Sequence, residues 1–287
     1  MHRAARLLFA AHLADGSGAV RAAAMDALGL ARRGWPVAIV FPGESPFVDS
    51  IRAQGLEAFV YPNPAVGLAE AQTVAGFLAL ARARLRYFAM IRRAIRAWRA
   101  EAMIAHSMAN LWAPLAARRE RIPLCLAVHE RYVESAAARL RKRIAQRLAR
   151  AMLFCSESGR EAFGALRAGM PAAVIENGVD ESRFDFAEEK LARMAQGGGG
   201  PEVRLLAVSA LARMKGLHDL IDAFQRIAVK RPEAALVIVG PDPPREAEYA
   251  RELRRMAEQS PAGRRILFHG PSSAVERFHQ QADLFVL

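Results

Sequence analysis

Short apolar runs alternate with longer amphipathic stretches throughout the first part of the chain. Residues 6–42 show the pattern clearly, with an apolar run, a glycine turn, a helix-like stretch, another glycine and a second apolar run. Apolar runs of this length are typical of buried strands, and the amphipathic stretches are long enough for helices. Further strands are expected at 56–62, 102–107, 123–130, 151–158 and at the start of 172–184. Strands that alternate with helices predict a parallel sheet with helices on both faces.

The same alternation begins again after four consecutive glycines at residues 197–200. Such a run is typical of a flexible linker. Strands are expected at 203–209, 234–240, 264–270 and 282–287, with helices at 216–230, 245–260 and 273–281. The fold class predicted is therefore α/β, with two doubly wound, Rossmann-like domains that face a cleft. The predicted parts are a first domain at residues 1–184, a linker at 185–202 and a partial second domain at 203–287.

The sequence ends in an apolar run, Leu284 to Leu287. The run predicts a buried strand, and such a strand needs further structure to cover it. We therefore expect the second domain to be incomplete and poorly stable. Limited proteolysis near the glycine linker is expected to leave the first domain.

Composition narrows the class of protein. With 53% hydrophobic and 24% charged residues, the chain resembles a globular protein. Cys125 and Cys155 both stand in apolar runs and are expected to be buried, reduced thiols, without a disulfide framework or a Cys/His metal site. The basic, apolar start is interpreted as a first strand and not as an export signal, because it leads directly into a glycine turn and a helix. No apolar stretch reaches the roughly 18 residues of a spanning helix. We expect a cytoplasmic protein, peripheral to a membrane at most.

The positive charge is concentrated in one segment. The formal net charge is +12, and residues 70–153 carry 17 Lys and Arg against 5 Asp and Glu, which accounts for all of it. A helix expected at 77–99 places apolar residues on one face and most of its arginines on the other, and a second basic cluster follows at 139–150. Two interpretations stay open: the basic faces bind an anionic membrane surface, or the apolar faces pack on the sheet and the arginines are merely solvated. Nucleic acid is not an expected partner, because the chain has neither a recognised binding motif nor interleaved aromatic residues.

Ligands of doubly wound sheets bind beyond the carboxyl ends of the strands, so the loops there are the candidates for chemistry. Gly16, Ser17 and Gly18 lie between the first strand and a helix, which suits a substrate or phosphate contact as well as a plain tight turn. A dinucleotide fingerprint would have a third glycine where Arg21 stands, and an acid after the second strand, where the sequence reads IVFPG. We therefore expect no nicotinamide cofactor.

Two further loops hold charged or titratable candidates. His129 and Glu130 directly follow an apolar run, where an imidazole could donate to a phosphate or a sugar hydroxyl. Lys215 precedes Gly216 at an expected helix start, so an ammonium, the helix dipole and free N–H groups together form a candidate diphosphate site. A structural histidine and a solvated turn are the plainer interpretations of these two loops.

Several of these segments, taken in order, resemble the family 4 glycosyltransferases, which have the GT-B fold. The resemblance rests on the glycine-rich loop after the first strand and on IPLCLAVHE, FCSES, ENGVD, LARMKG, ILFHG and ADLFVL. It implies a retaining transfer of a sugar from a nucleotide-sugar donor to an acceptor. It also implies that the reaction needs no metal ion or other cofactor.

The resemblance assigns roles to individual residues. His129 would contact the sugar or a phosphate as the catalytic candidate, with Glu130 beside it, and the loop of Gly16, Ser17 and Gly18 would line the donor–acceptor cleft. The implied donor-side residues are Arg213, Lys215, Gly216 and Gly270. The last of these begins the base-contacting loop, and the family's usual arginine beside the diphosphate falls at Ala210, so Arg213 is its candidate replacement.

The family continues beyond ADLFVL with a Pro-Ser loop and a Glu-x7-Glu segment that this sequence lacks. We therefore expect an incomplete enzyme with little activity of its own. If the basic segment binds an anionic membrane, a lipid-linked acceptor of cell-envelope polysaccharide or glycolipid synthesis is implied. Two alternatives stay open: a truncated, catalytically dead protein that binds a membrane or a partner, and a sugar-nucleotide epimerase that shares the fold.

Overall fold

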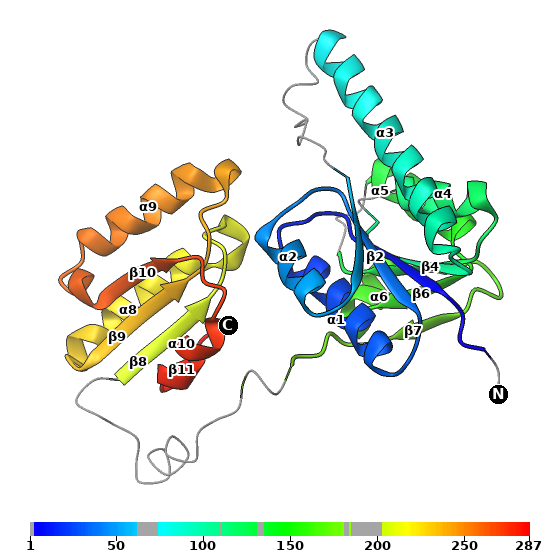
Figure 1. The fold of residues 1–287 in the computed structure, drawn as a ribbon. Coiled ribbons are helices and arrows are strands. Elements are labelled where there is room, and N and C mark those ends of the chain that lie inside the picture. Colours follow the sequence, from blue (N-terminus) through cyan, green and yellow to red (C-terminus); the bar gives the residue numbers. More distant parts are fainter. Residues whose placement is uncertain (1–2, 62–73, 109–110, 131–134, 181–183, 185–202) are drawn as a thin grey trace. The chain divides into compact units, whose positions relative to one another are not determined.

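The computed structural model describes residues 3–61, 74–108, 111–130, 135–180, 184 and 203–287, with backbone alone for 74–80 (Figure 1). By its internal contacts the chain divides into two units, Met1–Gly178 and Val179–Leu287. Phe184 lies edge-on to His279 of the second unit, with 5.5 Å between the ring centroids. The boundary between the two units therefore lies before residue 184, where the first domain was expected to end. The expected linker at 185–202 lies outside the described residues.

The first unit is built on a parallel sheet, as predicted. Its strands, all parallel, pair in the order β3-β2-β1-β4-β5-β6-β7. They are β1 (Leu7–Ala10), β2 (Val37–Phe41), β3 (Glu57–Val60), β4 (Ala102–His106), β5 (Leu124–Val128), β6 (Ala151–Phe154) and β7 (Ala172–Val174). The order reverses between β1 and β4, and ligands of doubly wound sheets bind at such a switch point.

Helices cover both faces of this sheet. They are α1 (Gly18–Arg32), α2 (Pro46–Ala53), α3 (Val74–Trp98), α4 (Trp112–Glu120), α5 (Ala136–Leu148) and α6 (Glu157–Phe163). Side chains alternate across a strand, so Leu8 of β1 packs into the core beneath α3, α4 and α5, while Phe9 packs into the core beneath α1 and α2. Ser45, Ser135 and Ser156 cap the N-termini of α2, α5 and α6 by accepting backbone N–H groups.

The basic helix expected at 77–99 is α3, whose N-terminal half projects away from the sheet (Figure 1). Tyr87, Ile91 and Ile95 are buried in the core. The arginines on the other side are exposed or paired, and Glu120 of α4 accepts from both Arg92 (2.5 Å) and Arg96 (2.8 Å). The sequence allowed either packing of the apolar face on the sheet or binding of the basic face to a membrane. The packing is confirmed for the buried residues, and membrane binding stays a prediction.

The second unit is a smaller parallel α/β layer. Its strands are β8 (Val203–Val208), β9 (Ala234–Val239), β10 (Ile266–Gly270) and β11 (Leu284–Phe285), in the order β10-β9-β8-β11. Its helices are α8 (Leu217–Lys230), α9 (Ala247–Glu258) and α10 (Val275–Gln281), with 3-10 turns η3 (Arg213–Lys215), η4 (Pro244–Glu246) and η5 (Gly263–Arg265). The core beneath α8 and α9 is large, whereas α10 shares a small core of three buried residues with the other face.

One expectation for this unit is wrong. The run from Leu284 to Leu287 does pair in parallel with β8, but only its first two residues form a strand. Leu284 is 57% exposed and Phe285 46% exposed, so the strand is not buried. β11 is the edge of the sheet, and the Phe285 ring contacts His279 of α10, with 4.7 Å between the ring centroids.

Two further features bear on the expectations from composition. Cys125 and Cys155 are free thiols, but each is half-buried and not fully buried. Burial raises the pKa of the Cys125 thiol to about 11, which leaves it protonated and unreactive at neutral pH. Within the described ranges, no helix has both the length and the apolar character needed to cross a membrane.

Candidate functional site

Three histidines lie at the carboxyl ends of three neighbouring strands in the first unit. His12 follows β1, His106 is the last residue of β4, and His129 follows β5. Because β4 pairs with both β1 and β5, these ends meet at one edge of the sheet. This edge includes the switch point between β1 and β4, so the histidines stand where the fold class places its ligands.

His106 and His129 are in direct contact. The Nδ1 atom of His106 lies 2.9 Å from the Nε2 atom of His129, and the two rings stack with centroids 5.1 Å apart. On its other side the His106 ring stacks on Phe9, at 5.8 Å. His106 is 1% exposed, so its ring is fixed between two others.

The histidines of this cluster are held neutral. Burial lowers the pKa of His106 to about 3, and the neighbouring His129 and His12 add to the effect. Burial also lowers the pKa of His129 and of His12, although the Glu130 carboxylate acts in the opposite direction on both. Removing an imidazolium from water is costly, so at neutral pH each ring carries one proton and keeps one bare nitrogen.

Glu130 supports the chain around His129. Its carboxylate accepts from the Ser107 hydroxyl, from the backbone N–H of Met108 at 3.4 Å and from that of His129 at 3.3 Å. Ser107 has a left-handed backbone (φ 75°), which the carboxylate helps to hold. In this structure the Glu130 oxygens are occupied by the protein itself, and its expected substrate contact stays a prediction.

The glycine-rich loop lies between β1 and α1, as expected. Gly16 has φ +68°, and a Cβ atom there would come within 2.9 Å of the Phe47 ring, so both conformation and space require glycine. Ser17 is the N-cap of α1, and its N–H donates to Asp15 at 3.0 Å. Gly18 has open space around the position of a Cβ atom. The Ser17 side chain makes no capping hydrogen bond to α1, and an uncapped helix N-terminus is a usual arrangement for binding an anion.

In the second unit, Lys215 ends the η3 turn directly before α8. Gly216 is the N-cap of α8 with φ 64°, a left-handed conformation that favours glycine. Lys215 is exposed, and no ion pair to it is found among the residues that the structure describes. An unpaired ammonium at a helix N-terminus is suited to a phosphate group.

Arg213 differs from Lys215 in having protein partners. Its guanidinium donates to Glu252 at 3.0 Å and stacks over the Tyr249 ring, 4.7 Å from the centroid. The Tyr249 hydroxyl also accepts the backbone N–H of His218 at 3.3 Å, within the first turn of α8. In this structure Arg213 thus joins η3 to α9, and its expected role as a diphosphate ligand stays a prediction.

Gly270 ends β10 with φ +83°, and its carbonyl accepts from Gly240 at 2.9 Å. Gly240 follows β9, and a Cβ atom there would lie 1.9 Å from the Ser209 carbonyl oxygen, so only glycine fits. The loop tips after β8, β9 and β10 are therefore held close together. This is the end of the second sheet at which Lys215 also lies.

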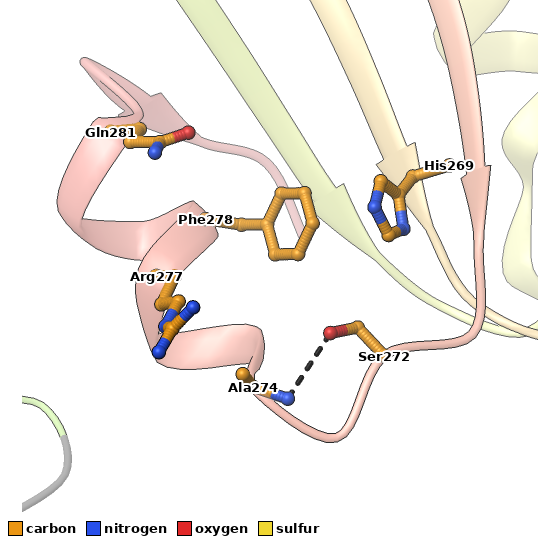
Figure 2. Close-up of a pocket in the computed structure, with 6 residues that line it drawn as sticks. All are labelled: His269, Ser272, Ala274, Arg277, Phe278 and Gln281. Atoms are coloured by element: carbon orange, nitrogen blue, oxygen red, sulfur yellow. Dashed lines mark hydrogen bonds between the residues drawn. The ribbon is translucent and has the colours of Figure 1, made fainter.

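A pocket of about 260 Å³ lies beyond Gly270, between β10 and α10. Figure 2 shows the rings of His269 and Phe278 facing each other across it, and their centroids are 4.5 Å apart. The hydroxyl of Ser272 accepts from the N–H of Ala274 at 3.1 Å and shapes the rim. The pocket therefore borders the loop in which a base contact was expected.

Sequence reasoning selected His129 but missed His106 and His12. All three follow apolar runs, so a search for histidines at expected strand ends would have found them. Asp26 of α1 was also missed; one carboxylate oxygen lies 3.9 Å from Nε2 of His106. No group of three His, Cys, Asp or Glu side chains among the described residues has the geometry to hold a metal ion.

Solved structures with the same fold cover almost the whole chain. HepE from Anabaena, in complex with UDP and glucose, matches with a TM-score of 0.76 and 20% identity over 98% of this chain and 73% of that chain. A glycosyltransferase from Rickettsia africae matches with a TM-score of 0.71 and 16% identity, over 98% of this chain and 72% of that one. A UDP-N-acetylglucosamine 2-epimerase described as putative, from Listeria monocytogenes, matches less closely, with a TM-score of 0.60 and 16% identity over 96% and 72% of the two chains. The Rossmann-like units are therefore those of the GT-B fold, as predicted.

Sequence comparison is more specific. A characterised relative, the GDP-mannose-dependent alpha-(1-6)-phosphatidylinositol monomannoside mannosyltransferase of Mycolicibacterium smegmatis, is 31% identical over 123 residues. The match covers 41% of this chain and only 31% of that protein's length. Residues 193–287 match the family model Glycosyl transferases group 1. Residues 16–183, more than half of the chain, match the model of Glycosyltransferase Family 4, and the protein belongs to that family.

Proposed function

We propose that the protein transfers a sugar from a nucleotide-sugar donor to an acceptor, with retention of the anomeric configuration and without a metal ion. The observation that carries the proposal is the match of residues 16–183 to Glycosyltransferase Family 4. The match of residues 193–287 to a second glycosyltransferase model and the fold shared with a UDP- and glucose-bound protein support it. The epimerase alternative receives less support, because the epimerase structure is the weaker fold match.

On the donor side, Lys215 is the proposed diphosphate ligand. Its ammonium is exposed directly before the N-terminus of α8, where the helix dipole also favours an anion. The pocket beside Gly270 is the proposed place for the nucleoside base, because it holds aromatic rings next to polar groups within the same unit. Phosphate and base would then bind to one rigid sheet end.

The donor proposal is tested by calorimetric titration of the protein with UDP and with GDP. A Lys215→Gln variant is expected to bind at least about tenfold more weakly, the loss of one charge-assisted contact worth about 1.4 kcal/mol. Lys230→Gln is the matched control, since Lys230 is equally exposed but lies at the other end of α8. Binding of neither nucleotide, or equal affinity of all three proteins, would contradict the proposal.

On the acceptor side, His129 is the proposed contact to the transferred sugar. It stands at the sheet edge of the first unit, near the glycine-rich loop that opens α1. Retention of the anomeric configuration is tested by NMR, which follows the anomeric proton signal of the product as transfer proceeds. A product of inverted configuration would exclude the retaining mechanism.

We further propose an acceptor in cell-envelope polysaccharide or glycolipid synthesis, reached at the cytoplasmic face of an anionic membrane. The relative from Mycolicibacterium smegmatis, whose name describes a mannosylated phosphatidylinositol acceptor, supports this class of acceptor. Arg141, Arg143 and Arg147 of α5 are exposed, and Leu140, next to Arg141, is 59% exposed. Because Tyr87, Ile91 and Ile95 of α3 are buried in the core, the attraction proposed here is mainly electrostatic.

Co-sedimentation with vesicles tests the membrane proposal. Vesicles with anionic phospholipid are expected to bind the protein at low salt and to release it as salt rises, because the Debye length shortens. Vesicles of neutral phospholipid alone are the control. Equal binding to both kinds of vesicle, or binding that salt does not weaken, would overturn an electrostatic contact.

A further inference from the structure

The contact between His106 and His129 has a consequence for the chemistry of His129. One nitrogen of each ring takes part in the 2.9 Å hydrogen bond, and both rings are neutral, so they share a single bridging proton. Either His106 donates from Nδ1 or His129 donates from Nε2. The choice determines whether the remaining nitrogen of His129, Nδ1, carries a proton or a lone pair.

The surroundings of His106 favour one of these arrangements. Its Nε2 atom is buried without a hydrogen-bond partner in the described part of the chain. The Asp26 carboxylate lies 3.9 Å from this nitrogen, too far for a hydrogen bond but close enough to favour one tautomer electrostatically. The Asp26 side chain is 59% exposed, so water keeps it ionised at neutral pH although burial raises its pKa. A carboxylate attracts an N–H group and repels a bare nitrogen, so the proton of His106 belongs on Nε2.

With the proton of His106 on Nε2, its Nδ1 atom can only accept. His129 must then donate from Nε2, and its own Nδ1 keeps a lone pair. Among the described residues, the histidine nitrogens that are fully buried without a hydrogen-bond partner are Nδ1 of His12 and Nε2 of His106. Nδ1 of His129 is not one of these fully buried atoms. His129 therefore presents a hydrogen-bond acceptor, suited to a hydroxyl group and unsuited to an ionised phosphate.

We propose that Asp26 and His106 are positioning residues that hold His129 as the tautomer with a proton on Nε2 and a bare, accepting Nδ1. His12, Glu130 and Cys155 are the other titratable groups near His129, and Asp15 lies near His12. Over the residues that the structure describes, no hydrogen bond joins His12 to His106 or His129, and the Glu130 carboxylate accepts the backbone N–H of His129, so neither group competes for the bridging proton. The role of His129 in contacting a sugar rests on the proposed function, whereas its tautomer does not depend on that function.

The test is a two-bond ¹H–¹⁵N correlation spectrum of the protein labelled at histidine, which distinguishes protonated from bare ring nitrogens. A His129→Gln variant identifies the His129 signals by their loss. In the unaltered protein, Nδ1 of His129 is expected to be bare and Nε2 protonated. A protonated Nδ1 would overturn the proposal.

Asp26→Ala tests the origin of the preference. The residue lies on the exposed part of α1, where alanine favours the helix. We expect the His129 nitrogen signals to move towards the average of the two tautomers, while Asp49→Ala, on α2 of the same unit, leaves them unchanged. Unchanged signals in Asp26→Ala would overturn the role of Asp26. Nucleotide binding is measured separately, so a failure of the donor proposal and a failure of this one are told apart.

Discussion

The two units share an architecture but place their chemistry differently. In the first unit the candidate groups are neutral histidines, one of them fully buried, held between a sheet edge and its covering helices. In the second unit the main candidate is an exposed lysine on a short turn before α8. Among the described residues, the first sheet has large cores on both faces, whereas the second has a large core on one face and a core of three buried residues on the other.

This difference shows how burial decides what a side chain can contribute. Burial strips water from His106, so its protonation and tautomer are set by protein neighbours. Lys215 is exposed to water, so it can meet an anion at little cost in desolvation. A unit that selects between hydroxyl groups benefits from the first arrangement, and a unit that binds a diphosphate benefits from the second.

The largest expected effect tests whether the units are stable independently. Phe224 of α8 is completely buried in the core of the second unit. Phe224→Ala should cost that unit about 3–5 kcal/mol, enough to unfold a small domain. All three tryptophans, Trp35, Trp98 and Trp112, belong to the first unit, so their fluorescence reports on it alone.

Urea unfolding followed by tryptophan fluorescence and by circular dichroism separates the two units. The variant is expected to keep the fluorescence transition of the unaltered protein while it loses part of the dichroism signal before urea is added. A fluorescence midpoint that falls with the variant would show that the units unfold together.

The next largest expected effect is a loss of stability of the first unit at acidic pH. The pKa of His106 is about 3 in the folded protein, below its value of about 6.5 in an unfolded chain, so the unfolded state binds protons more readily. The stability that depends on a neutral His106 is therefore complete above about pH 6.5 and is lost as the pH falls towards 3. At pH 5 this loss is about 2 kcal/mol for His106 alone.

Urea midpoints from tryptophan fluorescence at pH 7 and pH 5 measure this loss. The first unit should become less stable at pH 5, with His12 and His129 adding to the effect, since the pKa values of both are lowered. An exposed histidine of the second unit serves as control, and His269→Gln should leave the pH dependence unchanged. A flat pH dependence would contradict a buried neutral cluster.

A smaller effect is expected where α9 supports the η3 turn. Tyr249 is 2% exposed, and its hydroxyl contacts both the N–H and the Nδ1 of His218. Tyr249→Phe removes these contacts and should lower the stability of the second unit by about 1 kcal/mol. Circular dichroism during urea unfolding measures the loss, and a variant as stable as the unaltered protein would show that the contacts contribute nothing.

The smallest effect separates Arg213 from Lys215. The pair of Arg213 and Glu252 is well exposed, so Arg213→Ala should change stability by less than about 1 kcal/mol. Because Arg213 has protein partners, the variant should also bind nucleotides more strongly than Lys215→Gln does. Calorimetric titration with UDP and GDP measures both affinities. A larger loss of affinity in Arg213→Ala than in Lys215→Gln would make Arg213 the principal diphosphate ligand.

Much of the fold could be predicted from the sequence because the evidence for it is local. Periodicity over a few residues indicates strands and helices, and their alternation indicates parallel sheets. The start of α8 at Gly216 and the exposed Lys215 beside it were predicted for the same reason, since helix signals lie next to one another in the chain. The order of motifs also indicated the family.

What only the tertiary structure decided depends on contacts between distant segments. His12, His106 and His129 meet because the sheet has the strand order β1-β4-β5, and long-range packing sets that order. The partners of Arg213 come from α9, and the edge position of β11 comes from its pairing with β8. A sequence pattern records the environment of a residue along its own strand or helix, whereas the pKa and tautomer of His106 depend on neighbours that other strands and helices bring to it.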